Sequence, residues 1–169
     1  EQRERKLFRR MAVTPLSKGS MLWGQVSFRV TVGLAQAALF LLAGRVGFGL
    51  SIQGSPALLI AATIMGALVF VTLGYVLSGI TPHLEAAPLI AQPVQMAMMF
   101  LSGTLLPAPM LPTGVRSVIH AVPLTYVADA LRQTVSALPP LYPLWLDFAA
   151  MAGWIVLFSA LALALFRWE

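Results

Sequence analysis

Cysteine is absent from the 169-residue chain, and acidic side chains are scarce, six against eleven Lys and Arg. The absence of cysteine excludes disulfide bonds, cysteine-ligated zinc and iron–sulfur clusters. Charged residues make up only 10% of the chain and hydrophobic residues 59%, whereas about a quarter of the residues of a soluble domain are charged. This composition predicts an integral membrane protein.

The sequence motifs of several enzyme classes are also missing. No G-x-x-x-x-G-K-[ST] segment is present, so we expect no P-loop ATP site in this chain. There is no H-E-x-x-H or G-x-S-x-G segment, and the two histidines are too few for a typical zinc site. We therefore expect no catalytic residue, metal or cofactor here, and we interpret His83 and Glu85 as parts of a solvated turn.

Four apolar runs are long enough to cross a membrane, which requires about 20 apolar residues. They lie at about 21–44, 57–80, 88–106 and 144–166. Because backbone polar groups in lipid must be satisfied within the segment, such runs form helices. The predicted fold class is an all-α integral membrane protein, a polytopic helical bundle, with a transmembrane domain over residues 21–169.

Residues 107–138 are too apolar for a solvated loop, yet they cannot form one continuous span. Prolines and a glycine interrupt them, at Pro107, Pro109, Pro112, Gly114 and Pro123. We predict an outer re-entrant hairpin of two short helices, at about 113–121 and 123–137. Asp129 and Arg132 are three residues apart on the second helix, a spacing typical of an ion pair, and we interpret His120 as a packing residue.

The first 20 residues form a basic amphipathic segment, which Pro15 ends. If this segment is cytoplasmic, seven basic residues lie inside and three outside, as the positive-inside rule requires. Physical reasoning leaves two roles about equally open: a surface for a soluble partner, or a helix lying on anionic lipid. Since the first residue is Glu, we expect the chain to be a piece of a longer polypeptide.

Polar side chains within the spans are few. Arg29, near the start of the first span, is predicted to extend towards the lipid headgroups, with a functional intramembrane charge as the alternative. On the third span, Gln92 and Gln95 flank Pro93 and are followed by Met96 and Met99. A packed helix with an interhelical amide bond is the favoured interpretation. A flexible, polarisable wall of a substrate pathway is the alternative.

Two sequence motifs, one before the first span and one after the third, are recognisable. E-x-x-E-R-K-L-x-R-R-x-x-x-T-P-L precedes the first span, and S-G-T-L-L-P-x-x-x-L-P followed by P-L-T-Y-x-x-D-A-L-R comes after the third. The whole chain thus resembles the ABC-2 type permeases, the membrane subunits of type V ABC exporters. Permeases of this family usually have six spans, so the resemblance implies two more spans before Glu1.

The resemblance also implies roles for particular residues. The basic segment, residues 1–20, would be the cytoplasmic coupling helix that docks on an ATPase subunit. The docking residues would be Glu4, Arg5, Lys6, Leu7, Arg9, Arg10, Thr14, Pro15 and Leu16. The outer re-entrant hairpin would include Ser102, Gly103, Pro107, Leu111, Pro112, Pro123, Leu124, Tyr126, Asp129, Leu131 and Arg132.

The function implied is that of a permease subunit of an ATP-driven exporter. It would move an apolar or amphipathic substrate, such as a drug, lipid or glycolipid, out of the cytoplasm or inner leaflet. Expected partners are two copies of an ABC ATPase subunit, which would hold ATP and Mg²⁺, a second or related permease, and membrane lipids, but no nucleic acid. The expected location is the cell membrane, as a prokaryotic inner-membrane protein. The alternative is a non-transporting scaffold or anchor whose basic helix binds lipid or a partner.

Overall fold

The computed structural model describes residues 18–49, 54–81, 86–103, 118–135 and 139–165. In order, the elements are α2 (Lys18–Phe48), α3 (Pro56–Ile80), α4 (Ala87–Leu101), α6 (Pro123–Val135) and α7 (Leu144–Leu165). Within these ranges every regular element is a helix, which confirms the predicted all-α class.

Three of these helices are long and apolar enough to cross a membrane. Among the described residues, the spans are Gly24–Phe48, Pro56–Ile80 and Leu144–Leu165. They correspond to the predicted first, second and fourth apolar runs. Each has at least 22 residues, which at 1.5 Å per residue covers about 30 Å of hydrocarbon.

The predicted third run, 88–106, corresponds to the shorter helix α4. This helix has 15 residues and continues through Pro93, so it is about 22 Å long. A turn follows at Ser102 and Gly103, and the rest of the predicted run lies outside the described residues. Whether α4 belongs to a complete span therefore stays a prediction.

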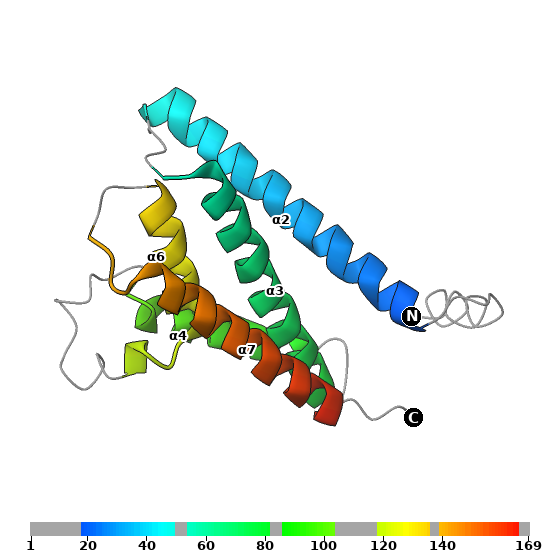
Figure 1. Ribbon diagram of the computed structural model, residues 1–169. Coiled ribbons are helices and arrows are strands. Elements are labelled where there is room, and N and C mark those ends of the chain that lie inside the picture. The colour runs from blue at the N-terminus through cyan, green and yellow to red at the C-terminus, as the bar shows by residue number, and fades with distance from the viewer. Residues whose placement is uncertain (1–17, 50–53, 82–85, 104–117, 136–138, 166–169) are drawn as a thin grey trace.

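Helix α3 is central, because it packs against α2, α4, α6 and α7 (Figure 1). Its most extensive contact is with α7, and the core between α3, α6 and α7 includes Ala62, Val69, Val127 and Met151. Gly66 lies close to α6, since a Cβ atom there would lie 2.7 Å from Val127 Cγ1. Small residues of this kind allow membrane helices to pack closely.

The C-terminal end of α6 is hydrogen-bonded to the residues just before α3. The Gly54 N–H donates a hydrogen bond of 3.1 Å to the carbonyl oxygen of Thr134. A side chain at position 54 would collide with this backbone, because its Cβ atom would lie 2.7 Å from the same oxygen. The helix begins at Pro123, as predicted for the second helix of the hairpin, and is described to Val135. Residues 136–137 of the predicted helix lie outside the described residues. Most of the first helix of the hairpin, at about 113–121, lies outside them as well.

Candidate functional site

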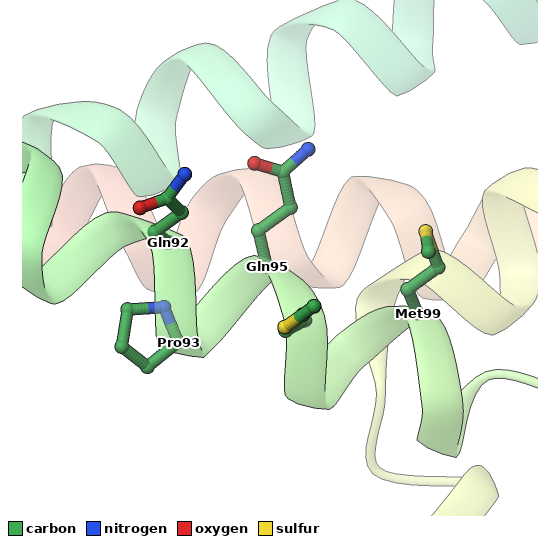
Figure 2. Close-up of a pocket in the computed structure, with 5 residues that line it drawn as sticks. Gln92, Pro93, Gln95 and Met99 are labelled. Carbon is green, nitrogen blue, oxygen red and sulfur yellow. The ribbon is translucent and has the colours of Figure 1, made fainter.

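The predicted pathway residues lie together on α4. Gln92, Gln95, Met96 and Met99, with Pro93, line a hollow of about 540 Å³. Figure 2 shows that Gln92, Gln95 and Met99 project from one side of the helix and Pro93 from the other. No residue of α4 is buried, and Met96 is 61% exposed. The two amides therefore face an accessible surface of the helix.

A second hollow lies between α4 and its neighbours. Its volume is about 530 Å³, and Gln95 and Met99 line it as well as the first one. The remaining lining residues come from α3 (Phe70, Leu73, Gly74 and Leu77), from α4 (Ala91, Val94 and Met98) and from Leu124 of α6. We call this second hollow the α3–α4 groove. Its lining carries no formal charge, and Gln95 supplies its polar side chain.

Arg29 of α2 lies close to this groove. Its guanidinium carbon is 6.0 Å from the centre of the Tyr75 ring on α3, within the range of a cation–π contact. Its Nη1 atom is 3.9 Å from the position that a Cβ atom would take at Gly74. The guanidinium group thus rests on α3 beside a residue that lines the groove.

A buried polar cluster joins α6 to the turn at 139–143 and to α7. The Asp129 carboxylate is fully buried and accepts hydrogen bonds from the backbone N–H groups of Leu141, at 3.0 and 3.1 Å, and Tyr142, at 3.0 Å. Gln133 Nε2 donates to Asp129 Oδ2, to the Tyr142 carbonyl and to Asp147 Oδ2. Since Asp147 is on α7, this one amide connects two helices and the turn between them.

Two tyrosines extend the cluster towards the start of α6. The Tyr126 hydroxyl donates a hydrogen bond of 2.6 Å to the backbone oxygen of His120. The Tyr142 hydroxyl pairs with His120 Nδ1, and the two tyrosine rings stack with their centres 5.4 Å apart. These contacts hold the turn before α6 against the turn before α7.

Burial raises the pKa of Tyr126 above its ordinary value of 10.0, and the charge of Asp147 adds to the rise. Burial is also the main cause of the raised pKa of Tyr142. The neighbouring Tyr126 and the two carboxylates act in the same direction on Tyr142. Both hydroxyl groups therefore remain protonated and able to donate at neutral pH.

The structure places the predicted residues in separate regions. The docking residues 4–16, as well as Pro107 and Pro112, lie outside the described residues. Pro123, Tyr126, Asp129 and Arg132 are all on α6, apart from the α4 residues. Leu124 is the residue of α6 that reaches the α3–α4 groove.

Sequence reasoning missed two members of the polar cluster, Gln133 and Asp147. Gln133 is one helical turn after Asp129, a spacing that places the two side chains on the same face. Asp147 stands in the first turn of an otherwise apolar helix, and a carboxylate at such a position requires a partner. Asp147 Oδ1 is buried and has no hydrogen-bond partner among the described residues.

The cluster has the chemistry of a structural connection. Within the described ranges, no group of three metal-binding side chains is present. The hydrogen bonds of Asp129 link α6 to its neighbouring turn. The α3–α4 groove has the chemistry of a binding surface for an apolar molecule.

The three long apolar helices define a multi-pass membrane protein. Residues 2–136 match the ABC-2 type transporter family, and the chain belongs to that family. It is thus the membrane-embedded permease component of an ABC transporter. No curated protein and no solved structure matches the chain.

Proposed function

We propose that this chain is the permease subunit of an ATP-driven exporter that moves an apolar or amphipathic substrate, such as a drug, lipid or glycolipid. The observation that carries the proposal is the family match over residues 2–136. That match covers the basic segment as well as the helices that line the α3–α4 groove. The groove supports the substrate class, because its uncharged wall suits a molecule with a large apolar part.

Energy would come from a partner. Two copies of an ABC ATPase subunit would bind ATP and Mg²⁺, and a second copy of this chain or a related permease would complete the assembly. The basic segment would dock on the ATPase through Glu4, Arg5, Lys6, Leu7, Arg9, Arg10, Thr14, Pro15 and Leu16. Charged and apolar side chains at helical spacing suit a groove on a soluble partner.

The basic segment would face the cytoplasm, in the cell membrane of a prokaryote. The positive charges before the first span favour this orientation. The pathway would run along α4, where Gln92 and Gln95 offer hydrogen bonds and Met96 and Met99 offer an adaptable apolar wall. Helix α4 suits this role because none of its side chains is committed to the core.

Purification of the tagged full-length protein from its native membrane tests the proposal. We expect an ABC ATPase in stoichiometric amount and ATP hydrolysis that vanadate inhibits. The double change Arg9→Glu with Arg10→Glu should abolish both while the protein still inserts. Arg45→Glu, at the other end of α2, is the control and should preserve them.

A preparation that contains no ATPase and hydrolyses no ATP would instead favour a membrane scaffold or anchor. In that case the double charge reversal would change only the affinity for lipid or for another partner.

A further inference from the structure

Arg29 is a positive charge inside a membrane span. It lies eight residues beyond Met21, where the predicted first span begins, and so about 12 Å along the helix. A charge at such depth is costly and is kept mainly where it has a function. The sequence predicts a side chain extended towards the headgroups, with a functional charge as the alternative. In the structure the guanidinium carbon lies 6.0 Å from the centre of the Tyr75 ring on α3.

No carboxylate in the described part of the chain neutralises this charge. The described residues include two acidic side chains, Asp129 and Asp147. Both belong to the polar cluster at α6 and α7, where Gln133 donates to both of them. The face of the Tyr75 ring attracts the cation. The Tyr75 hydroxyl oxygen is buried and has no hydrogen-bond partner among the described residues, so it accepts none of the five N–H donors of the guanidinium group. Arg29 is therefore suited to bind an external oxyanion.

Gly74 places this cation next to the α3–α4 groove. Gly74 lines the groove together with Phe70, Leu73 and Leu77. Arg29 Nη1 is 3.9 Å from the Cβ position of the same glycine. Arg29 is not itself among the residues that line the groove, so its guanidinium group lies beside the groove, against Gly74.

We propose that the α3–α4 groove holds the apolar tail of a transported anionic amphiphile, and that Arg29 binds its phosphate or carboxylate group. This inference rests on the proposed function and narrows its substrate class. A planar guanidinium group can donate two parallel hydrogen bonds to such an oxyanion. Gln95, at the edge of the groove, offers an amide to the uncharged polar part next to it. A cationic amphiphile would meet only repulsion from Arg29.

The test measures binding to the full-length protein in phosphatidylcholine vesicles, without ATP. The probe is stearic acid with a nitroxide group near the end of its chain, and its methyl ester is the uncharged comparison. The motionally restricted fraction in the electron spin resonance spectrum reports binding. At an alkaline pH, where the acid is ionised, we expect the acid to bind roughly tenfold more tightly than the ester, as a charge-assisted pair provides.

Three variants locate the site. Arg29→Gln should remove the preference for the acid, while Arg45→Gln, with the same loss of charge on the same helix, should keep it. Ala91→Phe should weaken the binding of acid and ester alike, because Ala91 lines the groove. Thermal unfolding of each variant checks that it is folded. If Arg29→Gln does not fold, two results still test the proposal: the acid–ester comparison in the native protein, and the effect of Ala91→Phe on binding.

The inference is overturned if acid and ester bind equally to the native protein, or if Arg29→Gln and Arg45→Gln behave alike. It is also overturned if Ala91→Phe has no effect, since the anion would then be an ordinary lipid on the outside of α2. These outcomes differ from failure of the proposed function. If an ABC ATPase co-purifies but the protein binds acid and ester equally, the exporter proposal stands. Only the anionic class of substrate is then ruled out.

Discussion

The two short helices α4 and α6 contrast in how they are attached to the rest of the protein. Helix α4 has no buried residue, whereas seven of the 13 residues of α6 are buried. Helix α6 is tied to α3 through Gly54 and to α7 through Gln133. Helix α4 lines the α3–α4 groove with residues of α3 and Leu124 of α6, and it exposes Met96 and Met99.

The contrast indicates that α6 has a structural role and that α4 provides a binding surface. Buried hydrogen bonds to a carboxylate hold a helix in one position, because any displacement leaves charged or polar groups unpaired. An exposed helix can shift against its neighbours at little cost. We therefore expect changes on α6 to lower stability, and changes on α4 to alter binding with little effect on stability.

The largest effect should come from Asp129→Ala. The change removes the acceptor of two backbone N–H groups and of Gln133, and it leaves the buried donors unpaired. We expect a loss of about 3–5 kcal/mol in the free energy of unfolding. Unfolding of the purified protein in detergent, followed by circular dichroism, measures it.

Asp129→Asn is the matched variant, because it keeps one oxygen to accept from the backbone. It should lose less stability than Asp129→Ala. Equal losses would show that the negative charge, rather than the acceptor geometry, holds α6 in place.

A smaller loss is expected from Gly66→Ala. The new methyl group would lie 2.7 Å from Val127 Cγ1, and a β-branched side chain has little freedom to turn away. We expect a loss of about 1–3 kcal/mol, typical of overpacking, in the same unfolding experiment.

Two further variants control this result. Gly153→Ala lies on α7 in open space and should be neutral or slightly stabilising. The pair Gly66→Ala with Val127→Ala should recover part of the loss. If the pair were no more stable than Gly66→Ala alone, the close approach of α3 and α6 would not explain the effect.

Alkaline pH should weaken the attachment of α6 more gently. The pKa of Tyr142 is raised above 10.0 in the folded protein. The protonated hydroxyl therefore stabilises the fold fully at a pH below the pKa of the unfolded chain. This stabilisation is lost as the pH rises through the pKa of the folded protein. Above about pH 10, the unfolded value, the unfolding temperature should therefore fall. Tyr142→Phe removes this titration and should flatten the decline. A decline of equal slope in the variant would exclude Tyr142 as its source.

The fold class was predictable because the apolar runs have the length of a membrane span and only helices satisfy their backbone there. The start of α6 was predictable for a similar local reason, because Pro123 sets it. The predicted end of this helix, at 137, lies outside the described residues. The family was recognisable from the order of the basic segment and the prolyl motif, and residues 2–136 confirm it.

The attachment of α6 was beyond sequence reasoning. Asp129 and Arg132 suggest a local ion pair by their spacing, and that pairing stays a prediction. The observed donors to Asp129 include backbone groups at Leu141 and Tyr142, which only the turn before α7 brings into reach. Asp147 gave no pattern because one acidic residue in an apolar helix has no periodicity to match.

The smallest effect on stability and the clearest effect on binding should come from Gln95→Leu. Gln95 lines both hollows along α4, and its helix has no buried residue, so the free energy of unfolding should change by less than about 0.5 kcal/mol. Transport of an amphipathic substrate in reconstituted vesicles should need a higher substrate concentration, because one hydrogen bond from the wall is lost. Leu89→Ala, a change at another exposed residue of α4, should leave both quantities unchanged. If Gln95→Leu instead destabilised the protein as Gly66→Ala does, α4 would be a packed part of the scaffold, and the contrast with α6 would fail.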